Sequence, residues 1–335
     1  MSKEAILWTS QDDGSVVCEL CNHFCRIGAE RLGKCGVRKN IAGRLHSLNY
    51  GRVVAMNVDP IEKKPFFHFL PGSKAFSVAS SGCNFSCQFC QNYSISQNPS
   101  HTLDCGRELS HKELIPLVQN HSCSSIAHTY TEPTIYFEHA IESAELAKEA
   151  GVKTLFVSNG FMGEKARDMM VGLVDAINVD LKAFSDKTYR EVVGGRLQPV
   201  LDNIAFFREK GVFLEITTLI ITDLNDGDKE LRDIAAFIAA VDPKIPWHVS
   251  RFHPDYNMMD RSATATSTIR RARDIGKEQG LHYVYSGNIP GDDGESSYCY
   301  NCGSLLVKRL GFRIVSNEMD GKLCPRCSAE QNFVI

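Results

Sequence analysis

The chain has 335 residues, of which 43% are hydrophobic and 23% are charged, and its formal net charge is −3. This length allows one large catalytic domain with small appendages. The weak net charge excludes a global attraction to nucleic acid or to anionic membranes. Neither a signal-peptide core nor a run of about 20 apolar residues occurs. The sequence therefore predicts a cytoplasmic protein that makes no membrane contact.

Cysteine is the unusual residue in the composition, with 13 copies in the chain. A reducing cytoplasm argues against disulfide bonds. Eleven of the cysteines lie in three tight groups, and such spacing is typical of metal ligands. The other two, Cys105 and Cys123, have no partners nearby and are expected to be small buried residues.

Residues 1–70 contain the first cysteine group within loop-like sequence, and they are predicted to form an N-terminal cysteine-rich metal-binding region. The spacing is C-x2-C-x3-C-x9-C, so four thiols are available for either a tetrahedral zinc ion or a second iron–sulfur cluster. The spacing does not decide between these metals. His23 lies inside the group and is expected to be exposed rather than a ligand. The predicted ligands are Cys18, Cys21, Cys25 and Cys35.

Residues 71–290 alternate short apolar runs with helical patterns, for example at 135–150 and 228–240. This alternation predicts an α/β fold with parallel strands and crossover helices. Six strands suit a partial (β/α)6 barrel at least as well as a doubly wound sheet. In both folds the chemistry lies at the C-terminal ends of the strands. The predicted strands cover residues 75–79, 125–130, 153–157, 176–181, 212–219 and 246–250.

The second cysteine group directly follows the first of these strands, with the spacing C-x3-C-x2-C at Cys83, Cys87 and Cys90. Such a loop can wrap three thiolates around three corners of a [4Fe-4S] cluster. No fourth cysteine stands nearby, so the fourth iron would be free to chelate S-adenosylmethionine (SAM). Reductive cleavage of SAM would then release a 5′-deoxyadenosyl radical. The alternatives are a zinc site that lacks one visible ligand and a chance grouping of cysteines.

These residues resemble the radical SAM superfamily, whose signature has an aromatic residue, here Phe89, before the last cysteine. Further short motifs resemble the glycyl-radical-enzyme activating branch, which includes pyruvate formate-lyase activase. The flanking cysteine groups are most similar to those of the radical SAM enzyme of the AmmeMemoRadiSam system. The motifs are Cys-Gln-Asn at 90–92, Thr-Glu-Pro at 131–133, Ser-Asn-Gly-Phe at 158–161, Asp-Leu-Lys at 180–182 and Phe-His-Pro at 252–254.

The resemblance implies an activase-like oxidoreductase that uses a [4Fe-4S] cluster and SAM. It also implies an electron donor such as flavodoxin or ferredoxin, and Memo-like and AMMECR-like proteins as partners. The family's Gly-Gly-Glu-Pro element meets the SAM ammonium, but here Tyr130 and Thr131 replace the two glycines. The residues that it assigns to SAM are Phe89, Glu132, Ser158, Asn159, Asp180, Lys182 and His253.

Six of these seven assignments, all except that of Phe89, have a structural alternative. Glu132 suits the start of a helix, where the helix dipole favours a carboxylate. Ser158 and Asn159 are also common turn residues. Asp180 and Lys182 alternate on one strand, so both side chains share a face and can form an ion pair there. His253 has the alternative of a loop residue without a ligand.

Residues 291–335 follow a Gly/Asp/Ser-rich linker and are predicted to form a zinc-ribbon-like domain. Two C-x2-C knuckles flank a stretch that can form a hairpin. Four thiolates would hold a structural Zn2+, with a rubredoxin-like iron or an electron-transfer cluster as the alternative. The ligands are Cys299, Cys302, Cys324 and Cys327.

Three functions fit these features. The first is hydrogen abstraction from a protein or peptide, as the activase resemblance implies. The second is radical modification of RNA or of a small molecule, for which the basic residues Lys308, Arg309 and Arg313 of the ribbon give a weak indication. The third is a non-enzymatic electron carrier with several metal centres, which leaves the polar residues at the strand ends without a role.

Overall fold

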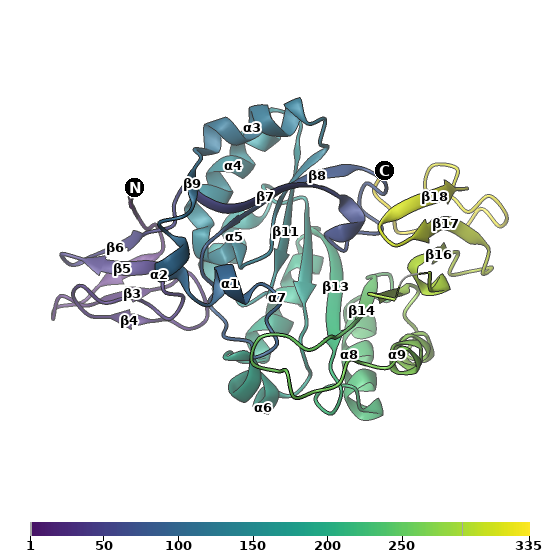
Figure 1. The fold of residues 1–335 in the computed structure, drawn as a ribbon. Helices are drawn as coiled ribbons and strands as arrows, with labels where there is room; N and C mark the ends of the chain where they lie inside the picture. The colour runs from purple at the N-terminus through teal and green to yellow at the C-terminus, as the bar shows by residue number, and fades with distance from the viewer. Residues whose placement is uncertain (1, 290) are drawn as a thin grey trace.

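The computed structural model describes residues 2–289 and 291–335 (Figure 1). Pro290, at the predicted end of the middle domain, lies outside the described residues. The centre of the molecule is a nine-stranded sheet with the order β15-β14-β13-β12-β11-β10-β8-β7-β9. Small sheets that carry the first and the third cysteine groups lie at opposite ends of it (Figure 1).

Seven strands of the central sheet run parallel and follow one another in chain order. A doubly wound sheet reverses its order at a switch point, so the uninterrupted order confirms barrel-like α/β winding. Six of the strands match the predicted ones, and β15 is an additional strand. Their bounds are β8 Lys74–Ser80, β10 Ser125–His128, β11 Lys153–Ser158, β12 Ala176–Asp180, β13 Phe213–Ile220, β14 Trp247–Arg251 and β15 Val284–Gly287.

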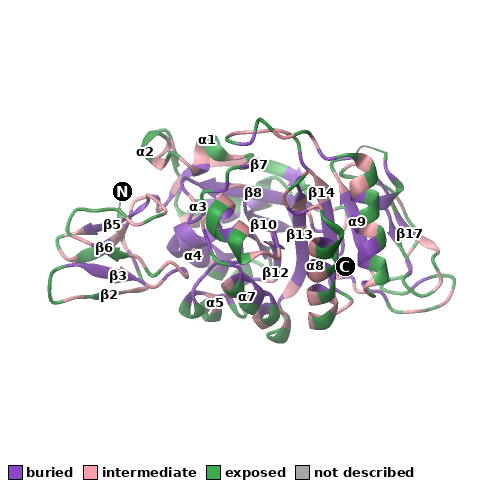
Figure 2. Cartoon of the chain, turned by 90° about the horizontal axis from the view of Figure 1, so that it is seen from below, coloured by how far each residue is buried: buried purple, intermediate pink, exposed green. Residues whose placement is uncertain are grey.

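The helices lie along the sheet, each with buried residues on one side and exposed residues on the other (Figure 2). In α8, for example, Leu231, Ile234, Ala235 and Ile238 are buried at the spacing of one helix face. Within the described residues, no helix is both long and apolar enough to cross a membrane. The main helices are α3 His111–Asn120, α4 Phe137–Glu149, α5 Glu164–Met170, α7 Gln198–Glu209, α8 Asp228–Val241 and α9 Thr266–Glu278.

Residues 61–70, which begin with the short helix η1 (Ile61–Lys63), fill the N-terminal end of the strand layer. Phe66 and Phe69 pack there against the first residues of the parallel strands. The buried Glu215 carboxylate of β13 accepts hydrogen bonds from the Phe67 and His68 backbone N–H groups, at 3.1 and 2.9 Å. This packing fills the N-terminal end of the strands, whereas their C-terminal end borders a cavity.

The first cysteine group lies on two three-stranded antiparallel sheets. A buried ion pair anchors these sheets to α4, because Arg38 donates to both carboxylate oxygens of Glu138 at 2.8 and 2.6 Å. The next strand, β7 (Arg52–Pro60), joins the central sheet antiparallel to β8, and β9 (Arg107–Glu108) follows at the edge. The small strands are β1 Lys3–Glu4, β2 Trp8–Ser10, β3 Val16–Cys18, β4 Arg26–Ile27, β5 Arg38–Ile41 and β6 Arg44–Ser47.

The C-terminal ribbon contains the expected hairpin, formed by β17 (Leu305–Leu310) and β18 (Arg313–Asn317), with β16 (Ser297–Tyr298) beside β17. Arg309 is buried rather than exposed, at 4% of its full accessible surface. Its guanidinium donates to Ser297 Oγ and to the Phe67 carbonyl, both at 2.7 Å, and lies 3.7 Å from Glu62. Arg309 therefore docks the ribbon onto the sheet and is not part of a basic surface.

Replacing Arg309 with methionine is expected to lower the free energy of unfolding by about 3 kcal/mol, because the buried Glu62 carboxylate loses its compensating charge. Urea unfolding measures this loss, and limited proteolysis should show earlier cleavage in the ribbon. The exposed neighbour Lys308 provides the control, since Lys308→Met should change stability by less than about 0.5 kcal/mol. Equal stability of both variants would contradict the docking role.

Candidate functional site

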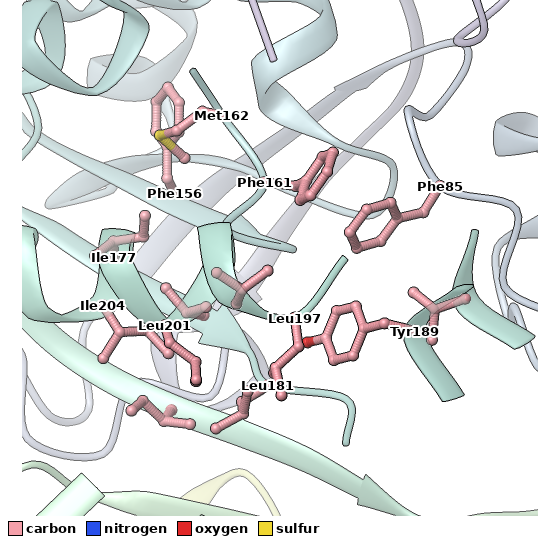
Figure 3. Packing of buried hydrophobic residues seen from close by; sticks show 14 of the residues in the cluster. Phe85, Phe156, Phe161, Met162, Ile177, Leu181, Tyr189, Leu197, Leu201 and Ile204 are labelled. Carbon is pink, nitrogen blue, oxygen red and sulfur yellow. The ribbon is translucent and has the colours of Figure 1, made fainter. Parts of the chain in front are cut away.

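The loop that carries the second cysteine group, residues 81–90 (the cluster loop), leaves the end of β8 and is fixed by aromatic packing. Phe85 lies against Phe161 and Tyr189, with ring centroids 5.0 and 6.2 Å apart (Figure 3). Phe85 also packs against Gly195, where a Cβ atom would lie 2.3 Å from the ring. Only glycine at position 195 therefore allows the loop to take this place.

Main-chain bonds hold the same loop against the π-helical turn η3 (Tyr189–Val193). The Ser86 N–H donates to the Val193 carbonyl at 2.9 Å, and the Gln88 N–H donates to the Val192 carbonyl at 3.1 Å. Gly194 ends the turn with a φ of +87°, in the left-handed region that glycine favours. Neither glycine was predicted to matter, although two adjacent glycines after a helical stretch were the available signal.

A cavity of about 220 Å³ opens at the C-terminal end of the parallel strands. The three thiols of the cluster loop line it, together with most of the residues that were predicted to contact SAM. Strand residues of β13 and β14, Thr217 and Ser250, complete its wall. The predicted residues in the lining are Cys83, Cys87, Phe89, Cys90, Glu132, Asn159, Asp180 and Lys182.

Asp180 and Lys182 project from the end of β12 into this cavity, as their alternation predicts. Their side chains form an ion pair of 3.0 Å. Burial disfavours the ammonium, but the nearby Asp180 and Cys87 outweigh this effect and raise the pKa of Lys182. Lys182 therefore stays charged at neutral pH, and it lies 5.9 Å from the centre of the Phe89 ring. The cavity thus presents a fixed pair of opposite charges to a zwitterionic ligand.

Glu132 is buried and caps η2 (Pro133–Tyr136), which precedes α4. Its carboxylate accepts hydrogen bonds from the Thr134 N–H and hydroxyl, at 3.0 and 2.6 Å, and from Ser158 Oγ, at 2.8 Å. A fourth bond comes from the Asn159 N–H at 2.7 Å. Burial raises the pKa of Glu132, although these bonds oppose the rise. Glu132 thus joins the ends of β10 and β11 as well as lining the cavity.

Comparison with known proteins identifies the family. The model of the radical SAM superfamily matches residues 77–238. An uncharacterised protein of Methanocaldococcus jannaschii is 37% identical to this chain over 336 residues, which cover 99% of this chain and 100% of the relative. The chain belongs to the radical SAM superfamily. The family implies a [4Fe-4S] cluster and SAM, and three converging thiols beside a charged cavity fit that pair.

Two further known proteins are similar to large parts of this chain. A second M. jannaschii protein, named as a glycyl-radical enzyme activating enzyme, is 26% identical over 61% of this chain and 77% of its own length. A radical SAM methyltransferase from Sphaerobacter thermophilus superimposes with a TM-score of 0.52 at 15% identity, over 71% of each chain. The structural likeness shows the fold alone.

Two of the residues assigned to SAM lie outside the lining of the radical SAM cavity. Ser158 is buried, and its hydroxyl donates a hydrogen bond to the Glu132 carboxylate. His253 is exposed, and it reaches the cavity only through Gln91, whose Nε2 lies 3.4 Å from His253 Nδ1. Contacts of Ser158 and His253 with SAM therefore stay predictions.

Tyr130 has the backbone conformation that glycine favours, with a φ of +67°. Its hydroxyl donates to Asp59 Oδ2 at 2.6 Å, and Lys64 Nζ lies 4.0 Å from its ring centre. Lys64 also pairs with Asp59 at 2.8 Å. The chain thus stabilises an unfavourable backbone angle at the cavity wall with a buried charge pair, which was not predicted.

The C-terminal thiols form the tight group that their spacing predicts. Their sulfur atoms all lie within 4.8 Å of one another, with Cys299 and Cys327 3.6 Å apart and Cys302 and Cys324 3.7 Å apart. A metal at 2.3 Å from each sulfur at tetrahedral angles requires a sulfur separation of about 3.8 Å. Hydrogen bonding from Ser304 lowers the pKa of Cys302 to about 6, which favours the thiolate. The group therefore fits a single tetrahedral ion, either zinc or iron.

Replacing Cys299 with alanine is expected to remove about one metal ion per chain and to destabilise the ribbon, because a closed four-thiolate site contributes directly to folding. Metal analysis by mass spectrometry, together with proteolysis of residues 291–335, measures both effects. The iron bound by the cluster loop should not change. An intact ribbon without metal would contradict this structural role.

The two ungrouped cysteines and His23 depart in part from expectation. Cys123 is buried as predicted, but Cys105 is exposed. His23 is half-buried rather than exposed, and its Nε2 lies 2.8 Å from the Asn84 carbonyl of the cluster loop. His23 therefore connects the first cysteine group to the cluster loop.

Proposed function

We propose that the protein reductively cleaves SAM and uses the resulting radical to abstract hydrogen from a protein or peptide substrate. The reaction would either activate a glycyl radical enzyme or modify a substrate of the AmmeMemoRadiSam system. One observation carries the proposal: three thiols converge on a cavity that also presents Asp180, Lys182 and Glu132. The relative that is named as an activating enzyme supports the activase-like class.

When bound, the cluster and SAM would supply the 5′-deoxyadenosyl radical. The chain's own residues hold and orient these cofactors. Cys83, Cys87 and Cys90 would bind three irons, and the Asp180–Lys182 pair would position the amino and carboxylate groups of SAM. Hydrogen abstraction by a carbon radical needs no general acid–base pair. The buried part of the lining consists of Phe85, Cys87, Phe89, Glu132 and Asn159.

The proposed partners are those expected for an activase-like radical SAM enzyme. A donor such as flavodoxin or ferredoxin would supply the electron, and Memo-like and AMMECR-like proteins would provide or process the substrate. Modification of RNA is less favoured, because burial of Arg309 leaves only Lys308 and Arg313 of the ribbon's predicted basic residues exposed.

The test is anaerobic reconstitution with iron and sulfide, followed by SAM and dithionite, with 5′-deoxyadenosine measured by mass spectrometry. Product that depends on both protein and reductant supports the proposal. Absence of product, together with an EPR signal of the reduced cluster that does not change when SAM is added, would overturn it. A changed signal without product would show that SAM binds and that cleavage waits for the substrate.

A further inference from the structure

We propose that the N-terminal thiol group (Cys18, Cys21, Cys25 and Cys35) binds a second [4Fe-4S] cluster that delivers electrons to the cluster loop. The delivery step rests on the proposed function, since its recipient is the cluster that would cleave SAM. The binding of the second cluster is independent of that function.

The first observation is the spacing of the thiols. All four line one cavity of the N-terminal region. Among the described residues, only the C-terminal ribbon brings its thiols within 4.8 Å of one another. The sulfur atoms of the N-terminal thiol group are therefore farther apart than the separation of about 3.8 Å that a single tetrahedral ion requires. The sulfur atoms of the cluster loop also do not all lie within 4.8 Å of one another. A four-iron cluster places iron atoms between its thiolates and therefore suits this wider spacing.

The second observation is an unpartnered donor in the wall of the same cavity. Arg38 is 1% exposed, and its two terminal nitrogens are taken by Glu138. Its Nε has no hydrogen-bond partner, although it is buried. A buried guanidinium N–H without an acceptor is costly. Thiolate or sulfide sulfur of a bound cluster would supply that acceptor.

The third observation is the contact between the two cysteine sites. A Cβ atom on Gly82, the residue before Cys83, would lie 2.9 Å from the Cys35 carbonyl oxygen. From standard backbone lengths, this places the Cα atoms of Cys35 and Cys83 within roughly 11 Å. Both residues also line a second cavity of about 190 Å³. The two sites are therefore neighbours.

Asn84 bridges the same gap. Its carbonyl meets His23, which lies between Cys21 and Cys25, at 2.8 Å. Its side chain lies beside Cys83, with Oδ1 3.8 Å from the sulfur. The Nδ2 of this buried amide has no partner. A hydrogen-bonded connection thus runs from one cysteine site to the other.

The electron transfer needs no reactant other than its donor. A low-potential one-electron donor of the flavodoxin or ferredoxin class reduces the N-terminal cluster from its 2+ to its 1+ state. That electron then reduces the cluster of the cluster loop from 2+ to 1+, and the N-terminal cluster returns to 2+. No bond forms or breaks in this transfer, and the electron is used when the carbon–sulfur bond of SAM breaks.

The test of binding is the triple variant Cys83→Ala/Cys87→Ala/Cys90→Ala, reconstituted anaerobically with iron and sulfide. It should retain about four irons and four sulfides per chain, against about eight of each for the wild type, and should give the EPR signal of a reduced cluster with dithionite. Iron in the ribbon would bring no sulfide, so the sulfide count separates the two sites. A triple variant without sulfide would overturn the proposal.

The test of delivery uses Cys18→Ser/Cys35→Ser, with Cys105→Ala as the matched control. Reduction of the cluster loop by flavodoxin hydroquinone, followed by stopped-flow absorbance, should slow by about tenfold or more in the double variant and not in the control. An unchanged rate would overturn delivery. If the wild type cleaves no SAM and its EPR signal does not change when SAM is added, the proposed function fails, while the sulfide count of the triple variant still decides the second cluster.

Discussion

Replacing Cys83 with alanine is expected to abolish SAM cleavage, with a loss of at least about a thousandfold, because two thiols cannot hold the cubane whose open iron would bind SAM. Iron and sulfide content should fall at the same time. The Cys83 sulfur also lies against the wall of the cavity, since Asn159 Nδ2 is 3.9 Å from it. The measurements are 5′-deoxyadenosine formation and iron and sulfide content.

Cys105→Ala is the matched control for this variant. Cys105 is exposed and belongs to none of the three groups, so its loss tests the effect of removing any one thiol. The control should keep full activity and full iron content. SAM cleavage that persists without Cys83 would remove the basis of the proposed function.

Replacing Glu132 with alanine is expected to lower the free energy of unfolding by about 4 kcal/mol and to reduce SAM binding. The Ser158 hydroxyl, the Asn159 N–H and the Thr134 N–H would lose their acceptor inside the protein, and each unpaired buried donor costs about 1–3 kcal/mol. Because Asn159 lines the cavity, its displacement would also alter the site. Denaturant unfolding and SAM titration measure the two effects.

Glu132→Gln separates hydrogen bonding from charge. The amide oxygen still accepts from Thr134 and Ser158, so we expect a loss of only about 1 kcal/mol for the bond from Asn159. If this isosteric variant binds SAM as the wild type does, Glu132 acts by positioning β10 and β11. If it binds SAM much more weakly while remaining stable, the carboxylate charge acts on the ligand. A stable Glu132→Ala variant would contradict the role of Glu132 as a capping centre.

The central fold was predictable because its strands are buried on both faces and therefore appear as continuous apolar runs. The alternation of Asp180 and Lys182 also placed both side chains correctly at the end of β12. The additional strand β15 was not predicted, since it has four residues and forms the edge of the sheet. The N-terminal strands have two to four residues, too few to show a period.

The missed site features depend on contacts between distant parts of the chain. The need for glycine at 195 arises from Phe85, more than a hundred positions earlier. Burial of Arg309 depends on Glu62 and Phe67, which lie in another region of the sequence. Local spacing identifies ligands that are close in sequence, but it carries no information on which side chains meet after folding.

The buried pair beneath Tyr130 bears on how the protein can be shortened. Asp59 and Lys64 precede the segment that matches the family, residues 77–238, and Ser250 of the cavity wall follows it. A fragment trimmed to the family match would keep the three thiols of the cluster loop but release Tyr130 from its strained backbone angle. We therefore expect such a minimal fragment to bind iron and to lose the shape of its ligand cavity. Engineering of this scaffold should keep residues 59 to 288 on one polypeptide, because Asn288 also lines the cavity.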